Sequence, residues 1–184
     1  MPGLVASLAV AAFLGYEGRL RQDDAARSLD AGAADEGTTR AIGAALPVAL
    51  LGPPVVAALR GRGLPLTVGW SGAVVAVGGT VLRLAAARAL GASYTRTLRV
   101  REDQAVVDSG LYAHVRHPGY AGVLALWLGY ALSWQSPAAL VPILPMVPAY
   151  IRRIDAEERL LESELGGPYA AYRGRTWRLV PRVY

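Results

Sequence analysis

Long apolar segments separated by charged clusters predict an all-α integral membrane protein with about five transmembrane helices. Hydrophobic residues make up 53% of the 184-residue chain and charged residues 18%, whereas a soluble domain carries about 25% charge. The charges cluster at 17–40, 60–62, 83–116 and 152–182. Because a helix needs roughly 20 apolar residues to cross the hydrocarbon of a bilayer, the apolar segments between these clusters are the candidate spans.

Five segments qualify as candidate helices, at about 2–18, 41–59, 66–90, 118–134 and 137–151. The last two are short and are separated only by Gln135 and Ser136, which predicts a tight helical hairpin. Prolines in the second and fifth segments are expected to kink them. Glycine and alanine crowd the first three segments, which predicts close helix packing through small residues. The first segment has no positively charged start and no clear cleavage site, so we expect a retained helix rather than a signal peptide.

The chain is expected to have two parts. Residues 1–90 form three transmembrane helices with a cytoplasmic loop at 19–40. Residues 91–184 form a core that comprises a loop at 91–117, the helical hairpin at 118–151, and a cytoplasmic amphipathic helix and tail at 152–184. Within the loop, 94–100 and 105–107 are typical of short extended pieces. Apolar residues on one face at 151–165 indicate the amphipathic helix, which Gly166, Gly167 and Pro168 should end.

The basic residues indicate orientation rather than nucleic-acid binding. All nineteen are arginines, most of them beside apolar segments, where they suit anionic lipid headgroups. With five spans, the 19–40 loop, the 91–117 segment and the C-terminal tail share one side and hold most of these arginines. The arginine-rich side of a membrane protein is the cytoplasmic one. We therefore expect an outside N-terminus and a cytoplasmic C-terminus, in a bacterial plasma membrane.

Several site types are excluded by composition or by missing motifs. The chain has no cysteine and two histidines, so a disulfide, a thiolate nucleophile and a cysteine-ligated metal are impossible and no metal site is expected. No Gly-x-Gly-x-x-Gly loop or Walker motif is present, which excludes a soluble Rossmann-type cofactor site and a Walker nucleotide site.

Three blocks of ionisable and aromatic residues indicate a site beside the last two apolar segments. The first runs from Gly110 to Gly122 and contains Arg116, His117 and two tyrosines; the second is at 152–161 and the third at 166–172. Ionisable groups are costly beside a membrane, so their clustering favours a functional site. Taken singly, Arg116 and His117 could be headgroup contacts. His114 is expected to be a surface histidine.

Together these blocks resemble the isoprenylcysteine carboxyl methyltransferase (ICMT) family and related membrane enzymes that methylate phospholipid amines. The family pattern is Gly-x-Tyr-x-x-Val-Arg-His-Pro-x-Tyr-x-Gly, then Glu-Glu-x-x-Leu, then Gly-x-x-Tyr-x-x-Tyr. It is matched here at 110–122, 157–161 and 166–172. The resemblance covers about 80–182. A weaker similarity to bacterial members lies at 35–37, Asp-Glu-Gly.

The resemblance implies S-adenosyl-L-methionine as methyl donor, with S-adenosyl-L-homocysteine as product. The segment at about 105–112 would line the donor site partly through its backbone, and Pro118 would start the fourth helix. Arg153 and Glu157 match a catalytic pair thought to orient the substrate. The residues implied in cofactor binding are Val106, Val107, Gly110, Tyr112, Arg116, His117, Pro118, Tyr120, Glu158 and Tyr169.

Methyl transfer from a sulfonium requires mainly alignment of nucleophile, methyl group and sulfur. A carboxylate acceptor needs no general base but needs a cation such as Arg153, whereas an amine acceptor needs a base such as Glu157. The resemblance favours carboxyl O-methylation of an isoprenylcysteine-like or other lipophilic carboxylate. The expected partners are a lipophilic or prenylated substrate and membrane lipids, with no nucleic acid and no metal.

Three alternatives stay open. One is N-methylation of a phospholipid or other lipid amine. Another is an NADPH-dependent membrane reductase, because sterol reductases carry a related Arg-His-Pro-x-Tyr segment, although those proteins are usually longer. The last is a non-enzymatic membrane module, which would leave the clustering of Arg116, His117, Arg153 and Glu157 unexplained.

Overall fold

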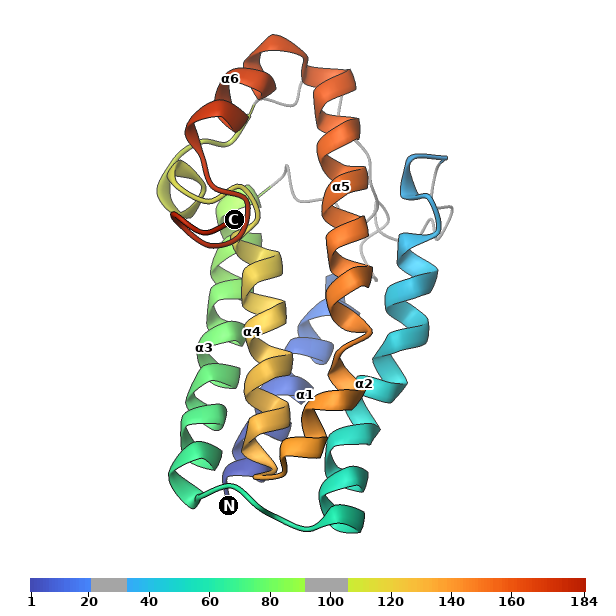
Figure 1. Cartoon of the computed structure of the whole chain (residues 1–184). Helices are drawn as coiled ribbons and strands as arrows, with labels where there is room; N and C mark the ends of the chain where they lie inside the picture. The colour runs from blue at the N-terminus through green and yellow to red at the C-terminus, as the bar shows by residue number, and fades with distance from the viewer. Residues whose placement is uncertain (21–32, 92–105) are drawn as a thin grey trace.

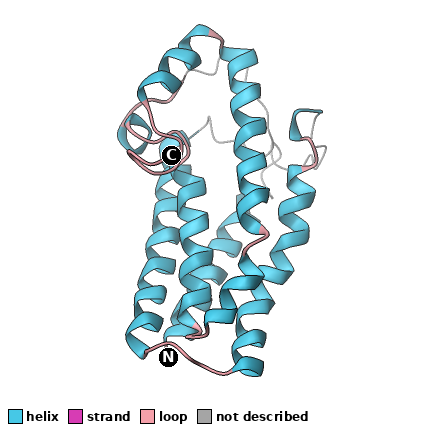
Figure 2. Ribbon diagram, in the orientation of Figure 1, coloured by secondary structure: helices cyan, strands magenta, loops and turns pink. Residues whose placement is uncertain are grey.

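The chain is a bundle of helices in the computed structural model, which describes residues 1–20, 33–91 and 106–184 (Figure 1). Every regular element in these residues is a helix (Figure 2), and the only extended pairing there is an isolated bridge between Val115 and Trp177. The all-α prediction is therefore confirmed for this part of the chain. The helices are α1 (Pro2–Leu20), η2 (Ala33–Asp35), α2 (Thr38–Arg60), α3 (Leu66–Leu90), η4 (Gly110–Ala113), α4 (Pro118–Ser133), η5 (Pro137–Ile143), α5 (Met146–Leu165) and α6 (Gly167–Arg175).

Helices α2 and α3 are long and apolar enough to cross a membrane. Only 22% of the most apolar window of α2 and 33% of that of α3 is buried against other helices. Large apolar side chains on both helices are therefore exposed, among them Leu51, Leu59, Val74 and Val81. Such a surface is unfavourable in water and favourable in lipid. The expected total of five spans stays a prediction, since α4, with 16 residues, reaches only about 24 Å at about 1.5 Å per residue.

Helices α3 and α4 pack with their backbones almost in contact, as the glycine content predicts. A Cβ placed on Gly79 would lie 2.5 Å from the carbonyl oxygen of Gly122, and one on Gly129 would lie 2.4 Å from the carbonyl oxygen of Gly72. Neither position has room for a side chain. The prediction of close packing through small residues is confirmed at this interface.

The end of the bundle that holds the N-terminus is tied by hydrogen bonds between two turns. The backbone N–H groups of Gly63 and Leu64, between α2 and α3, both donate to the carbonyl oxygen of Gln135 at 2.9 Å. Gln135 has a positive φ of 59° and directly follows α4, in the turn that leads into η5. The α4–η5 hairpin therefore turns back at this end, as expected from the short polar break at 135–136.

The fifth element differs from its prediction. The segment at 137–151 is not one helix: η5 ends at Ile143, and a new α-helix begins at Met146. Proline lacks the N–H that an α-helix needs in its interior, and Pro142 and Pro145 stand at the break. Pro148 lies in the first turn of α5, where an N–H would have no intrahelical partner. The prolines of α2, in contrast, lie within one continuous helix.

Helix α5 also joins two elements that the sequence pattern separates. The amphipathic helix expected from 151 or 152 is the C-terminal part of α5, which runs unbroken from Met146 to Leu165. It extends beyond the ends of α3 and α4 (Figure 1). Gly166, with a φ of 56°, ends it as expected. The tail then forms α6, which was not predicted and which turns the chain back over the ends of α3 and α4 (Figure 1).

The segment expected to be extended lies mostly outside the described residues. Residues 94–100 and Ala105 are not among them, and residues 106–107 have no regular structure. The first regular element after this segment is the short helix η4, which contains Gly110 and Tyr112.

Two neighbouring glycines of α3 test the packing against α4. Gly79→Ala should lower the free energy of unfolding by about 1–3 kcal/mol, because its new methyl group meets backbone atoms of α4 that move only if the helices separate. Gly78→Ala is the matched control, since nothing lies within 4 Å of its Cβ position. Thermal unfolding in detergent should show a lower melting temperature for the first variant and an unchanged or slightly higher one for the second. Equal behaviour would contradict the packing.

Candidate functional site

The first sequence block leads directly into α4. His117 precedes the helix and Pro118 is its first residue, a position where proline is favoured because its fixed φ suits the helix and its missing N–H is not needed. The expected start of the helix at Pro118 is confirmed. His117 is 5% exposed, whereas His114 is exposed at the surface, as expected.

The C-terminal tail is paired with this block through backbone hydrogen bonds. The N–H of Arg116 donates to the carbonyl oxygen of Trp177 at 2.8 Å, and that of His117 donates to the carbonyl oxygen of Arg178 at 3.1 Å. In return, the N–H of Trp177 donates to the carbonyl oxygen of His114 at 2.8 Å. The tail therefore lies against the start of α4 and brings Arg178 to it.

The carboxylate of Glu158 joins the block, the tail and α5. Its Oε1 accepts from Arg116 Nε at 2.9 Å and lies 3.0 Å from His117 Nε2, while its Oε2 lies 3.3 Å from Arg178 Nη2. Burial alone would raise the pKa of this carboxyl group. The hydrogen bonds from His117 and Arg116, with the charges of His117 and Arg178, outweigh burial and lower the pKa to about 2. Glu158 is therefore ionised at neutral pH, beside three basic side chains.

The tyrosines of α6 pack beside this cluster. Tyr169 is 2% exposed, and its hydroxyl group has no hydrogen-bond partner among the described residues. Burial raises the pKa of Tyr169, and the charge of Glu158 adds to that rise. Tyr172 packs against Tyr169 with ring centroids 6.1 Å apart, and its hydroxyl group donates to the carbonyl oxygen of Tyr112 at 2.8 Å. An unsatisfied buried hydroxyl group is unusual in a folded protein.

A second cluster lies one residue earlier on α5. The Tyr120 hydroxyl group donates to Glu157 Oε2 at 2.7 Å and accepts from Arg153 Nε at 3.4 Å. Arg153 is 4% exposed and forms an ion pair with Asp35. A short turn separates Asp35 from the start of α2. Arg153 and Glu157 are thus linked through Tyr120, on the side of α5 that also meets the first loop.

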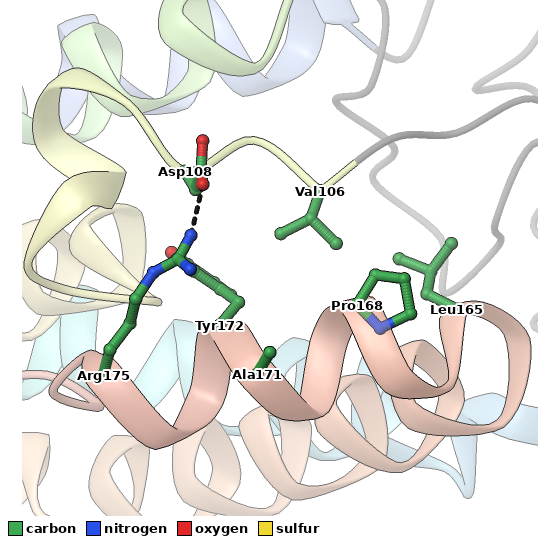
Figure 3. Close-up of a pocket in the computed structure, with 7 residues that line it drawn as sticks. All are labelled: Val106, Asp108, Leu165, Pro168, Ala171, Tyr172 and Arg175. Carbon is green, nitrogen blue, oxygen red and sulfur yellow. Dashed lines mark hydrogen bonds and ion pairs between the residues drawn. The ribbon is translucent and has the colours of Figure 1, made fainter.

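A pocket of about 500 Å³ lies between α6 and the segment that precedes η4, and Figure 3 shows the side chains that line it. An ion pair between Asp108 and Arg175 lies at one edge of it. Of the residues predicted to bind the cofactor, this pocket contains Val106. It is lined by Val106, Asp108, Leu165, Pro168, Ala171, Tyr172 and Arg175.

The predicted site residues fall into groups in the structure. Arg116 and His117 both contact Glu158, and Tyr169 is buried nearby. Tyr120, Arg153 and Glu157 form the second cluster. Of the remaining predicted residues, Tyr112 is buried against α6, Val107 is half-buried and Gly110 is exposed. Their roles in cofactor binding stay predictions.

Sequence reasoning missed two residues of these clusters. Asp35 was noted only as part of a weak similarity, and Arg178 only as one arginine of a basic tail. The Asp-Glu-Gly similarity at 35–37 is a signal that could have marked Asp35. Nothing in the sequence distinguishes Arg178 from its neighbours, because its position depends on the backbone pairing at Trp177.

Acid titration tests the Glu158 cluster. The folded-state pKa of about 2 lies below the ordinary value of 4.5, so the cluster stabilises the fold above about pH 4.5 and loses that effect as the pH falls toward 2. Glu158→Gln should cost about 3 kcal/mol at neutral pH, since it removes the buried charge that Arg116, His117 and Arg178 share. The difference from the wild type should shrink as the pH falls.

The control for this titration is Glu162→Gln, which removes an exposed carboxylate of α5 that pairs with Arg173. Exposed pairs contribute about 0–1 kcal/mol. Unfolding in detergent across this pH range gives both comparisons. A stability difference for Glu158→Gln that stays constant down to pH 2 would contradict the assignment.

Comparison with known proteins adds independent information. The family model for the isoprenylcysteine carboxyl methyltransferase (ICMT) family matches residues 72–163, which covers α4 and most of α3 and α5, with Arg116, His117 and Glu158 but not Arg178. The Gly166–Tyr172 block lies outside that match.

Curated relatives point to the same family. The chain is 27% identical over 122 residues to a protein-S-isoprenylcysteine O-methyltransferase of Dictyostelium discoideum, covering 62% of this chain and 50% of the relative. It is 32% identical over 119 residues to a probable protein-S-isoprenylcysteine O-methyltransferase of Oryza sativa subsp. indica, covering 63% and 62%. Arabidopsis thaliana protein-S-isoprenylcysteine O-methyltransferase B is 30% identical over 108 residues, covering 57% and 55%. The chain thus spans between 50% and 62% of the length of these relatives. It belongs to the isoprenylcysteine carboxyl methyltransferase family.

Proposed function

We propose that this chain is a membrane methyltransferase that transfers the methyl group of S-adenosyl-L-methionine to the carboxylate of a lipophilic molecule of the isoprenylcysteine type. The observation that carries the proposal is the meeting of two ionic clusters at one end of apolar helices. Glu158 with Arg116 and His117 forms one cluster, and Tyr120 with Arg153 and Glu157 forms the other. The family's relatives, which are methyltransferases by name, support the reaction type.

The residues present fit a methyl donor of this kind. The buried Tyr169 hydroxyl group has an unused hydrogen-bonding capacity, and a donor with amino and carboxyl groups offers partners for it. Glu158 holds the basic side chains of Arg116 and Arg178 in place, and these suit the carboxylate of the donor. The aromatic rings of Tyr169 and Tyr172 supply a surface for an apolar or aromatic part of the donor.

When bound, S-adenosyl-L-methionine supplies a methyl group that is already activated by the positive charge on its sulfur. The protein's task is then alignment. His117, Glu158 and Tyr169 would hold the methyl donor. Tyr120, whose ring lies 5.8 Å from that of His117, stands between the two clusters and would border both ligands. A carboxylate acceptor is itself the nucleophile, so no proton has to be removed before transfer.

Arg153 would orient such an acceptor through its charge. A guanidinium group presents its N–H donors in a planar fork that matches the geometry of a carboxylate. The acceptor's apolar part would lie among the membrane helices. A site at the boundary between membrane and water serves a lipophilic acceptor and a water-soluble methyl donor together.

The membrane arrangement is part of the proposal. The family is membrane-bound, and α2 and α3 are long and apolar enough to cross. Five spans, with the N-terminus outside and the site on the cytoplasmic side, accord with the arginine distribution. The relatives reported above are eukaryotic and lend no support to a bacterial plasma membrane, which stays a prediction.

One observation favours a second acceptor class, a lipid amine. Arg153 already faces two carboxylates, because Asp35 pairs with it directly and Glu157 is linked to it through Tyr120. Such a cluster is better matched to a cationic acceptor than a single arginine would be. For an amine, Glu157 would be the general base. The NADPH-dependent reductase has no comparable support, since the relatives are methyltransferases by name.

Donor binding can be tested without an acceptor. His117→Ala should weaken the binding of S-adenosyl-L-homocysteine about 10–100-fold, because it removes a partner that holds the Glu158 carboxylate. His114→Ala is the matched control, since that side chain is exposed. Isothermal titration calorimetry on purified protein in detergent measures both. If the wild type binds S-adenosyl-L-homocysteine no better than NADPH, the proposed function fails.

Glu157→Gln separates the two acceptor classes. Transfer to an S-prenylated N-acetylcysteine should fall no more than about tenfold, because only the hydrogen bond to Tyr120 is altered. Transfer to a lipid amine should fall about 10²–10⁴-fold, because the base is lost. Glu164→Gln, exposed on the same helix, is the control. Radiolabelled methyl transfer to each acceptor gives the rates, and a large loss with the carboxylate acceptor would contradict the expectation that this acceptor needs no base.

A further inference from the structure

Asp35 is a buried carboxylate with partners on two helices. It is 2% exposed and stands just before α2. Its Oδ1 accepts from the hydroxyl groups of Thr38 at 3.1 Å and Thr39 at 2.7 Å, and its Oδ2 accepts from the N–H of Thr39 at 3.1 Å. It also pairs with Arg153 on α5. Asp35 therefore joins the start of α2 to the helix that carries the proposed acceptor site.

The charge on Asp35 is maintained despite its burial. Burial raises the pKa of the Asp35 carboxyl group, but the hydrogen bonds from Thr39 and the charge of Arg153 outweigh it, so the pKa is lowered overall. The ion pair is thus present at neutral pH. A buried charge of this kind is costly to maintain unless it is fully paired, and Asp35 meets that condition through three side chains.

The contacts of Asp35 also fix the orientation of the Arg153 side chain, which contacts Tyr120 in the proposed acceptor site. Its Nη1 is held by Asp35 and by the hydroxyl groups of Thr38 at 3.1 Å and Thr39 at 3.3 Å. Because the guanidinium group is planar and rigid, holding Nη1 also determines where Nε points. Nε donates to the Tyr120 hydroxyl group at 3.4 Å, which in turn donates to Glu157 at 2.7 Å.

Taken in order, Asp35, Arg153, Tyr120 and Glu157 form one continuous chain of hydrogen bonds. It begins before α2 and ends at a carboxylate one residue from Glu158. We propose that Asp35 is a positioning residue for methyl transfer: by holding the Arg153 guanidinium group, it sets the Tyr120 hydroxyl group and, through it, Glu157 at the acceptor side of the site. This inference rests on the proposed function and assigns Asp35 a part in it.

The position of Asp35 separates its effect from that of the methyl-donor cluster. Glu158 is held by Arg116, His117 and Arg178, whereas Asp35 is held by Thr38, Thr39 and Arg153 within the described part of the chain. Loss of the Asp35 charge should therefore change acceptor kinetics and leave methyl-donor affinity nearly unchanged. A residue that only stabilised the fold would change both.

The first experiment compares Asp35→Asn with Glu36→Gln. Glu36 is the adjacent acidic residue, and its ion pair with Arg159 is exposed. Glu36→Gln therefore removes one negative charge, as Asp35→Asn does, but leaves the buried ion pair between Asp35 and Arg153 intact. For Asp35→Asn we expect kcat/KM for the acceptor to fall about 10–100-fold, with the Kd of S-adenosyl-L-homocysteine within about twofold of wild type. Glu36→Gln should match the wild type in both. Equal values for the two variants, or a parallel loss of donor affinity, would overturn the proposal.

A second variant guards against misfolding of Asp35→Asn. Thr38→Val keeps both charges and nearly the same volume, and it removes one hydroxyl group that donates to Asp35 and accepts from Arg153. It should lower acceptor kcat/KM in the same direction by a smaller factor, again with unchanged donor affinity. A wild-type acceptor kcat/KM in a folded Thr38→Val protein, together with an unfolded Asp35→Asn protein, would show that Asp35 is structural only.

A spectroscopic measurement separates this proposal from the proposed function. Carbon-13 at Cζ of tyrosine reports on the hydroxyl group, and Tyr120→Phe identifies the Tyr120 signal. That signal should shift in Asp35→Asn and stay in place in Glu36→Gln. If the wild type methylates neither acceptor class, the proposed function fails, while this signal still decides whether Asp35 positions Tyr120. An unmoved signal in folded Asp35→Asn would overturn the inference.

Discussion

The ionic contacts of the Glu158 carboxylate are the interaction on which the end of the bundle opposite the N-terminus depends. Arg116 and His117 come from the start of α4, and Arg178 comes from the tail. Without an anion between them, these basic groups would repel one another in a buried place. The Glu158 carboxylate on α5 offsets that repulsion, and Asp155 on the same helix also pairs with Arg178. The start of α4, α5 and the tail are thus held together by charge as well as by the backbone hydrogen bonds of the tail.

The apolar helices below make this attachment possible. Their glycines allow α3 and α4 to approach until backbone atoms are almost in contact, which gives the start of α4 a rigid base. Helix α5 begins only after the prolines that end η5, and it then runs without a break beyond the ends of its neighbours. The ionic clusters thus lie at the ends of helices whose apolar parts are held together by close packing. At the end opposite the N-terminus, charge holds the same helices together.

Sequence reasoning predicted the helical class, the packing through glycines, the start of α4 at Pro118 and the end of α5 at Gly166. Each depends on local chemistry: apolar length, a missing side chain, a fixed φ or a positive φ. It failed where the outcome depended on context. The pattern of 137–165 gives no sign that the helix restarts at Met146, because three closely spaced prolines allow several breaks. Helix α6 was missed for a similar reason, since its polar and aromatic residues show no clear helical pattern and were assigned to an irregular C-terminal tail.

The same contrast applies to the candidate site. Arg116 and His117 lie in the first motif and Glu158 in the second, and the structure brings both basic side chains into contact with Glu158. The ion pair between Asp35 and Arg153 joins residues 118 positions apart, and no periodicity in a single sequence reports such a pairing. Arg153 was expected to work mainly with Glu157, whereas among the described residues it forms an ion pair with Asp35, shortly before α2. Long-range ionic contacts of this kind become visible only with the fold.

The unbroken course of α5 has a consequence for how the two ligands of the site would influence each other. Glu157 and Glu158 are consecutive residues of one rigid helix, yet one belongs to the acceptor cluster and the other to the methyl-donor cluster. Any rotation or tilt of α5 that accompanies one ligand therefore moves the groups that contact the other. Thermodynamic linkage then requires that each ligand change the affinity of the other by the same factor. Because α5 has no break between these two residues, the rigid helix itself would couple the binding of the two ligands.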